Sequence, residues 1–117
     1  CFIDIDERQD AIHLGTFVGE KLVSVGSLFQ MNSPRLQHDH QYRLRAMATD
    51  PDYSGTGAGR MLVEFALETL KQNAVNVLWC DARLKAVGFY EKIGFTAYDD
   101  VYEVPLIGPH RFMYYII

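Results

Sequence analysis

The sequence predicts a single α/β domain, residues 1–117, built around one mixed β-sheet. β-Rich segments fill the first part of the chain, two amphipathic helical patterns follow, and a short apolar run at residues 75–82 lies between those two patterns. A strand, a loop, a helix and a second strand in this order form a βαβ unit, so one pair of neighbouring strands should be parallel. A chain of 117 residues can bury one hydrophobic core but not two.

The first elements are predicted to be a hairpin and a third strand. Residues Ala11–Val18 and Lys21–Gln30 are β-rich and are separated by Gly19-Glu20, which is typical of a hairpin turn. Residues 32–41 contain Asn-Ser-Pro and a polar cluster, so we expect a loop there. A third strand is expected over residues 42–48, with side chains that alternate between two faces. One face carries Leu44, Ala46 and Ala48, and the other carries Arg43, Arg45 and Met47.

Two helices are predicted in the second half of the chain. The first follows a glycine-rich stretch and ends near residues 72–73, and the second covers residues 84–93. Gly94 should end the second helix as a left-handed cap, with Phe95 as the hydrophobic contact of that cap. The expected apolar stripes are Met61, Leu62, Phe65, Ala66 and Leu70 on the first helix, and Ala86, Phe89, Tyr90 and Ile93 on the second.

The tail of the chain offers three more strands. They are expected at residues 95–98, 102–104 and 111–117, because these runs are rich in aromatic and β-branched side chains. The connection between the last two contains Pro105, Gly108 and Pro109, which should interrupt regular structure.

The glycine-rich stretch between the third strand and the first helix predicts an anion-binding loop. Its three alternate glycines, Gly55, Gly57 and Gly59, let backbone N–H groups approach one ligand with no Cβ in the way. The helix N-terminus that follows adds unpaired amides and the positive end of its dipole, so a pyrophosphate would fit. A turn that serves chain geometry alone remains the alternative.

Two familiar nucleotide-binding loops do not fit this stretch. The dinucleotide pattern Gly-x-Gly-x-x-Gly would need glycine at a position that holds Arg60 or Leu62. The triphosphate-binding loop needs Gly-Lys-Ser/Thr, whereas Arg60 and Met61 follow Gly59 here.

The spacing instead resembles the Gln/Arg-x-x-Gly-x-Gly/Ala loop of the GNAT superfamily of N-acetyltransferases, with Ser54 at the place of Gln or Arg. The resemblance implies a mixed sheet with a splayed parallel strand pair flanked by helices. It also implies that acetyl-CoA binds at the splay, with its pyrophosphate on the glycine loop and its pantetheine arm along the preceding strand. The residues that would bind acetyl-CoA are Met47, Ala48, Thr49, Ser54, Gly55, Thr56, Gly57, Ala58, Gly59 and Arg60.

A second segment, residues 86–95, resembles the Ala-x-x-x-Tyr-x-x-x-Gly-Phe helix of the same superfamily. The resemblance implies that the Tyr90 hydroxyl lies near the coenzyme A sulfur and assists departure of the thiolate as general acid. A core tyrosine whose hydroxyl finds a polar partner is the alternative. Arg83 stands where the superfamily often has Asn, so the usual contact of that asparagine is in doubt. Residues 108–113 are similar to one group of small bacterial GNAT proteins.

The general base is not evident from the sequence. The third strand carries Arg43 and Arg45 where some superfamily members have a glutamate, and these arginines could attract an acidic group of the acceptor or pair with Asp50 or Asp52. His110 is the first candidate base, because imidazole titrates near neutral pH, with a structural hydrogen-bonding role as the alternative.

No metal is expected, although His38, Asp39 and His40 resemble a metal or base cluster in composition. They are interpreted as a solvated loop, because no further ligands at metal-site spacing join them.

The charge and hydropathy of the chain argue against a nucleic-acid or membrane partner. The chain has 11 Lys and Arg against 15 Asp and Glu, a net charge of −4, and no basic stretch interleaved with aromatic residues, so we expect no nucleic-acid partner. No apolar segment approaches the roughly 20 residues that span a bilayer, so no membrane contact is expected and the location should be cytoplasmic. Cys80 should be a buried, inert thiol. A chain that starts at Cys1 suggests a missing N-terminal segment.

The predicted function is therefore transfer of the acetyl group of acetyl-CoA to a primary amine of an unidentified small-molecule or peptide acceptor. The resemblance also implies a possible homodimer. One alternative is a noncatalytic coenzyme A-binding sensor or interaction module, which the departures at Ser54 and Arg83 favour. Another is a small α/β nucleotide-binding domain that ATP or NAD would occupy.

Overall fold

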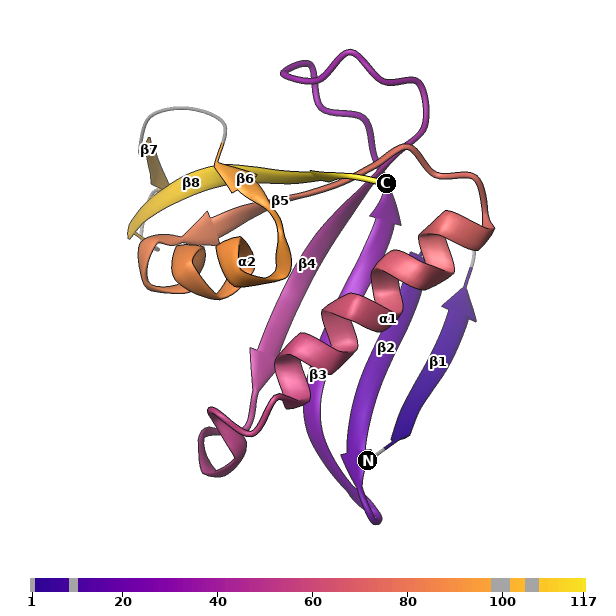
Figure 1. Ribbon diagram of the computed structural model, residues 1–117, viewed down its shortest axis with the longest axis vertical. Helices are drawn as coiled ribbons and strands as arrows, with labels where there is room; N and C mark the ends of the chain where they lie inside the picture. The colour runs from indigo at the N-terminus through magenta and orange to yellow at the C-terminus, as the bar shows by residue number, and fades with distance from the viewer. Residues whose placement is uncertain (1, 9–10, 98–101, 105–107) are drawn as a thin grey trace.

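The computed structural model describes residues 2–8, 11–97, 102–104 and 108–117, which form one mixed sheet with both helices on the same face (Figure 1). The described strands follow the order β1-β2-β3-β4-β5-β8-β6, and β7 pairs with β8. The elements in chain order are β1 (Phe2–Arg8), β2 (Ala11–Val18), β3 (Lys21–Gln30), β4 (Gln41–Thr49), the 3-10 turn η1 (Pro51–Tyr53), α1 (Ala58–Gln72), β5 (Val77–Arg83), the 3-10 turn η2 (Leu84–Ala86), α2 (Val87–Ile93), β6 (Thr96–Ala97), β7 (Tyr102–Val104) and β8 (Gly108–Ile116).

The predicted hairpin is confirmed with its predicted bounds. Strands β2 and β3 pair antiparallel, and β4 continues the antiparallel sheet on the other side of β3. Strand β4 is one residue longer at each end than predicted. Strand β1, which pairs antiparallel with β2, was not predicted from the sequence.

The parallel pair predicted from the βαβ unit consists of β4 and β5, and it is short. Only three register pairs join them, Gln41 with Val77, Tyr42 with Leu78 and Arg43 with Trp79. Beyond these pairs β4 stays with β3, whereas β5 pairs with β8 along its whole length. The two strands therefore diverge, and Figure 1 shows β4 running away from β5. The splayed parallel pair is confirmed.

A bulge in β4 makes part of the predicted side-chain alternation wrong. The register between β3 and β4 shifts between Val25 and Ser27, and Ala46 has a φ of 56° in the left-handed region. Beyond the bulge Met47 lies on the helix-covered face, where its Sδ and a Leu44 methyl both approach Gly26. The alternation predicts Met47 and Leu44 on opposite faces, and the extra residue at the bulge brings them to the same one.

The predicted helices are confirmed, with two differences in detail. Helix α1 buries Leu62, Val63, Ala66 and Leu70, whereas Met61 and Phe65 are 40% and 39% exposed and lie outside the apolar stripe in which they were predicted. The second predicted helix begins as the 3-10 turn η2 and becomes α-helical at Val87.

The core fills the space between the helices and one face of the sheet. Alternate positions of β5, Leu78, Cys80 and Ala82, point into it from the middle of the sheet. Both helices therefore cover the same face, and within the described residues the opposite face carries no helix. The buried members of the core are Leu14, Leu28, Leu44, Leu62, Val63, Ala66, Leu70, Val75, Leu78, Cys80, Ala82, Tyr90, Phe95 and Met113.

The tail strands are confirmed with shifted bounds. Strand β8 begins at Gly108, so Gly108 and Pro109 belong to a strand and do not interrupt it as predicted. Pro109 pairs in register with Glu103 of β7, on the side of β8 away from β5. The predicted break at Pro105 lies outside the described residues.

Gly94 ends α2 as predicted, with a φ of 122°. The N–H groups of Gly94 and Phe95 both donate to the Tyr90 carbonyl, at 3.2 and 3.0 Å. The Phe95 ring then packs 5.2 Å from the Tyr90 ring, which is the predicted hydrophobic contact of the cap.

Gly94→Ala should lower the free energy of unfolding by about 1–3 kcal/mol, because alanine is strained at this φ and strained backbone costs that much. The new Cβ would also lie 2.9 Å from a Tyr115 ring carbon. Gly88→Ala is the matched control: it lies in the same helix with open space at its Cβ, and should be neutral or stabilising by roughly 0.5–1 kcal/mol. Denaturant unfolding of both variants checks this, and equal effects would contradict it.

Candidate functional site

The glycine loop has the backbone geometry that anion binding requires. Gly55 and Gly57 adopt φ values of 80° and 90°, and a Cβ at either position would meet nothing within 4 Å. Gly57 is the N-cap residue of α1, and its carbonyl accepts the Met61 N–H at 2.9 Å. The loop is therefore curled with open space outside it, where a ligand can approach the backbone.

The first turn of α1 offers amide donors to that space. The bond from Met61 to Gly57 is the first backbone bond of the helix, so within the described chain the amides of residues 58–60 have no backbone partner. The N-cap residue Gly57 has no side chain to cap this end, and the first turn holds no acidic residue but does hold the exposed Arg60. These amides, the helix dipole and Arg60 together favour an anion such as a pyrophosphate.

Two buried hydroxyl groups attach the start of α1 to the sheet. Thr16 of β2 and Ser24 of β3, which are 0% and 2% exposed, both donate to the Ala58 carbonyl, at 3.4 and 3.3 Å. Burial of these hydroxyls is tolerated because both are hydrogen-bonded. The position of the glycine loop relative to the sheet is therefore set from below by β2 and β3.

Gly59 is the point where β4, α1 and α2 meet. A Cβ there would lie 3.0 Å from Thr49 Oγ1, 3.3 Å from Met47 Cε and 3.5 Å from Phe89 Cε1. Only a residue without a side chain allows the helix to start this close to the end of β4.

Strand β4 presents an unpaired backbone edge next to the glycine loop. Ala48 and Thr49 pair with Val25 and Ser24 of β3, but no register pair joins this part of β4 to β5. Among the described residues, the edge that faces the splay thus has backbone groups with no strand partner, which an extended amide-containing ligand can satisfy. The predicted acetyl-CoA contacts, Met47, Ala48 and Thr49, lead directly to the predicted pyrophosphate contacts in residues 54–60.

Tyr90 lies in the core beneath the splay and is 6% exposed. Its ring makes edge contacts with Phe89 and Phe95, at centroid distances of 5.0 and 5.2 Å. Burial, with a smaller contribution from Cys80, raises the pKa of Tyr90 above the ordinary range of a phenol. The phenol is therefore protonated at neutral pH and can donate a proton or a hydrogen bond.

His110 lies in β8 and is also 6% exposed. Its Nδ1–H donates to the Gly108 carbonyl at 2.8 Å, as the predicted structural alternative requires. His110 pairs in register with Arg83, three positions along β5 from Cys80, which lies beside Tyr90. Because side chains alternate along β8, His110 points to the face opposite Met113 and the core. The structure does not bring His110 and Tyr90 together on one face.

Arg43 has a partner that the sequence did not suggest. Its Nη2 lies 2.7 Å from a carboxylate oxygen of Asp81, so the predicted pairing with Asp50 or Asp52 is wrong. Asp50 instead accepts the Asp52 N–H and lies 3.6 Å from Lys21 Nζ. The overlooked signal is Asp81 itself, a single carboxylate at the end of an apolar run that forms a central strand.

The cluster at residues 38–40 is a hydrogen-bonded loop. The His40 Nδ1–H donates to the Ala74 carbonyl at 3.1 Å, and the Asp39 carbonyl accepts the Asn32 side-chain amide. The described residues include no group of three or more His, Cys, Asp or Glu that could hold a metal ion. Among them there is also no helix with the length and apolarity needed to cross a membrane.

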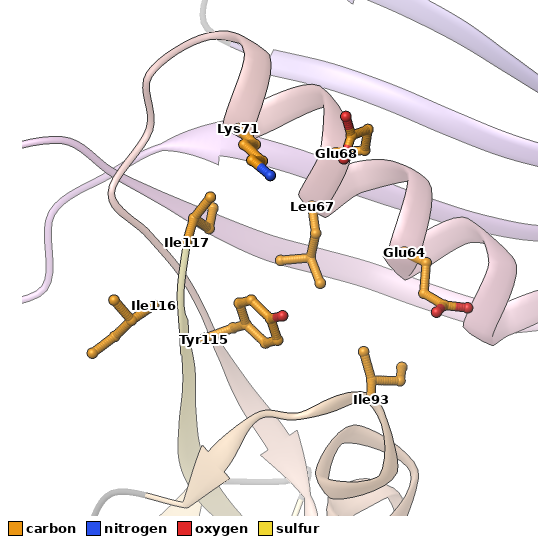
Figure 2. Close-up of a pocket in the computed structure, with 8 residues that line it drawn as sticks. All are labelled: Glu64, Leu67, Glu68, Lys71, Ile93, Tyr115, Ile116 and Ile117. Atoms are coloured by element: carbon orange, nitrogen blue, oxygen red, sulfur yellow. The ribbon is translucent and has the colours of Figure 1, made fainter.

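A groove and a smaller hollow are lined by described residues near the sheet, and the smaller one touches the predicted site. Figure 2 shows a groove of about 320 Å³ between α1, the end of α2 and the end of β8, where Glu64, Lys71, Ile93 and Tyr115 surround the opening. None of the predicted acetyl-CoA contacts lines it. A smaller hollow of about 260 Å³ between β3 and β4 includes Ala48 and Thr49. The anion-binding geometry therefore lies on the open loop and strand edge, away from the larger groove.

In comparisons with known proteins, the family model, the relatives and the solved structure are all those of acetyltransferases. Residues 1–95 match the model of the acetyltransferase (GNAT) family. The chain is 34% identical over 114 residues to YitI, an uncharacterized N-acetyltransferase of Bacillus subtilis, which covers 97% of this chain and 76% of YitI. It is 38% identical over 53 residues to the ribosomal protein bS18-alanine N-acetyltransferase of Escherichia coli, which covers 43% of this chain and 36% of that protein. The crystal structure of the Bacillus subtilis N-acetyltransferase YlbP in complex with coenzyme A superposes with a TM-score of 0.70 at 25% identity, over 90% of this chain and 67% of that one.

Gly57→Ala should weaken coenzyme A binding by about tenfold, because strain of roughly 1–2 kcal/mol at this φ is relieved only if the loop amides move. Gly19→Ala is the matched control, since Gly19 also has a positive φ and open space at its Cβ but lies in the turn between β2 and β3. Calorimetric titration with coenzyme A should show a loss of affinity in the first variant alone. Equal affinities for both variants would remove the loop from the binding site.

The raised pKa of Tyr90 should make the protein less stable at high pH. In the unfolded chain the phenol ionises near pH 10, whereas in the folded protein it stays neutral, so unfolding releases a proton and stability falls as the pH rises above about 10. Urea unfolding at pH 8 and pH 11 should show a larger loss for the wild type than for Tyr90→Phe. Tyr53→Phe is the control, because Tyr53 is a partly exposed residue in η1. Between pH 8 and pH 11 this variant should lose as much free energy of unfolding as the wild type does.

Proposed function

Because the chain belongs to the GNAT family of acetyltransferases, we propose that it transfers the acetyl group of acetyl-CoA to a primary amine. Acetyl-CoA-dependent N-acetyl transfer is the enzyme class of this family and of the N-acetyltransferase relatives. In this proposal residues 1–117 act as a single domain of that type, and acetyl-CoA is a substrate that binds at the splay.

One observation supports the proposal: within the part of the chain that the structure describes, an edge of β4 without a strand partner leads directly into a curled loop whose amides have no backbone partner. The edge from Met47 to Thr49 suits the amides of a pantetheine arm, and the loop from Ser54 to Arg60 suits the pyrophosphate. The two parts follow one another in the chain, so one elongated ligand can contact both. Ser54 is exposed and offers a hydroxyl where other members carry a longer side chain.

The reaction is direct attack of an amine on the thioester. The amine nitrogen forms a bond to the acetyl carbon, the carbon–sulfur bond breaks, and the thiolate needs a proton. Tyr90 supplies that proton in our proposal, which its position beside β5 supports. A hydrogen bond from a protonated phenol to the sulfur stabilises charge as it builds in the transition state.

The acceptor is proposed to be an amine of a small molecule or a peptide. The bS18-alanine N-acetyltransferase of Escherichia coli acts on an alanine of a ribosomal protein. The segment that resembles this relative covers 43% of the present chain. His110 stays a candidate base from the sequence, and its short bond to Gly108 supports the structural role more directly.

The test measures free thiol released from acetyl-CoA with and without a panel of primary amines. The proposed enzyme releases coenzyme A in proportion to the amine supplied. A sensor module, which Ser54 and Arg83 would favour, binds acetyl-CoA by calorimetry but releases no amine-dependent thiol. Competition by ATP or NAD, with no effect of coenzyme A, would instead indicate a nucleotide-binding domain.

Tyr90→Phe should lower turnover by about 10²-fold or more, within the usual range for a general acid, and leave acetyl-CoA affinity within about twofold of the wild type. The hydroxyl is removed while the ring and its contacts with Phe89 and Phe95 remain. Steady-state kinetics and calorimetry on the same preparation check this. Unchanged turnover would exclude the phenol from the mechanism.

A further inference from the structure

Three residues with hydroxyl groups form one register row of the sheet beneath the first turn of α1. Thr16 of β2 pairs with Ser24 of β3, and Ser24 pairs in turn with Thr49 of β4. Thr16 and Ser24 both donate to the Ala58 carbonyl. The half-buried Thr49 continues the row to the splay, where its Oγ1 lies 3.0 Å from the place that a Cβ at Gly59 would take. We call Thr16, Ser24 and Thr49 the hydroxyl row.

Two members of the hydroxyl row occupy positions where the strands otherwise place apolar side chains. Thr16 shares the helix-covered face of β2 with Leu14, and Ser24 shares the helix-covered face of β3 with Leu28. Both are as fully buried as these leucines. Burial of a hydroxyl group costs free energy that an alanine or valine in the same place would not cost. Packing of the core therefore does not explain why hydroxyl groups stand at these two positions.

Helix α1 does not need the two hydroxyl groups for its own hydrogen bonds either. Within an α-helix the carbonyl of residue 58 accepts the N–H of residue 62. Thr16 and Ser24 are thus additional donors to an oxygen that already has a partner in the helix. Their common effect is that two neighbouring strands hold one peptide group, the one between Ala58 and Gly59.

The peptide group that the hydroxyls hold also carries one of the proposed ligand donors. The Ala58 carbonyl and the Gly59 N–H belong to the same peptide group, and this N–H has no backbone partner within the described chain. Thr16 and Ser24 therefore fix the position of an amide that is directed toward the start of the helix and the glycine loop. Hydrogen bonds to the carbonyl also polarise the peptide group, which makes its N–H a better donor to an anion.

We propose that Thr16 and Ser24 are positioning residues for the pyrophosphate of coenzyme A. The inference rests on the proposed binding of acetyl-CoA at the glycine loop. Neither side chain contacts the ligand: the two hydroxyls act through Ala58, which lies 42 and 34 residues further along the chain. Because they hold the loop amides in place before the ligand arrives, less conformational freedom is lost on binding and the affinity is higher.

The experiment compares Thr16→Val and Ser24→Ala with the wild type by calorimetric titration with coenzyme A. Each variant should bind coenzyme A about threefold to tenfold more weakly, and the double variant at least roughly tenfold more weakly, as expected for the loss of one and two hydrogen bonds. Thr16→Ser keeps the hydroxyl and should stay within about twofold of the wild type. Ser27→Ala is the matched control, because the Ser27 hydroxyl lies in the same strand as Ser24 but bonds to His13 on the opposite face.

A second measurement separates positioning of the pyrophosphate site from a general effect on the fold. S-Acetylpantetheine carries the thioester but no pyrophosphate, so its kcat/KM should fall by less than about twofold in Thr16→Val and Ser24→Ala. The kcat/KM for acetyl-CoA should fall in step with the coenzyme A affinity. Denaturant unfolding shows which variants are folded, and the single variants decide the question if the double variant is not.

Three results would overturn the inference: equal losses with the two acetyl donors, a loss of affinity in Ser27→Ala as large as in Ser24→Ala, or wild-type affinity in both Thr16→Val and Ser24→Ala. A failure of the proposed function is recognised separately. A wild-type protein that binds coenzyme A but releases no amine-dependent thiol would overturn acetyl transfer, and the calorimetric comparison would still decide the role of Thr16 and Ser24. A wild-type protein that binds no coenzyme A would overturn both proposals.

Discussion

The constraint on which the rest of the structure depends is that β4 and β5 share only three register pairs. Two neighbouring parallel strands would normally satisfy each other along their whole length. Here β5 pairs with β8 along its whole length, whereas β4 pairs with β3. The sheet remains continuous at one end and opens at the other. As a result, among the described residues the splayed edge of β4 has backbone groups without a strand partner, which are open to an elongated ligand.

The bulge in β4 adjusts what this splayed edge presents. Ala46 adopts a left-handed φ that is rare for a residue with a side chain, and strain of this kind is tolerated where the surroundings hold it in place. Its effect is to send Met47 and Thr49 toward the start of α1, where they contact Gly59, and to leave Arg43 and Ala48 on the opposite face. The strand therefore contacts the helix start with one face and forms part of the helix-free face of the sheet with the other.

Much of this arrangement could be predicted from local sequence. The hairpin, both helices, the Gly94 cap and the parallel pair each follow from a pattern that lies within a few residues, such as 3.6-residue periodicity or a turn glycine. Features that depend on residues far away in the chain could not be predicted in this way. The φ of Ala46 arises from the register with β3, and the exposure of Met61 and Phe65 depends on how α1 is rotated against the sheet. The bond between Asp81 and Arg43 joins residues that lie 38 positions apart in the chain.

The close approach at Gly59 has a mechanical consequence. The first turn of α1, the end of β4 and the Phe89 ring lie close together there with no space for a side chain at Gly59, and the Phe89 ring lies edge-on to the Tyr90 ring. A larger residue at position 59 would therefore displace the start of α1, the end of β4 or the Phe89 ring, and Phe89 is the neighbour of the Tyr90 ring.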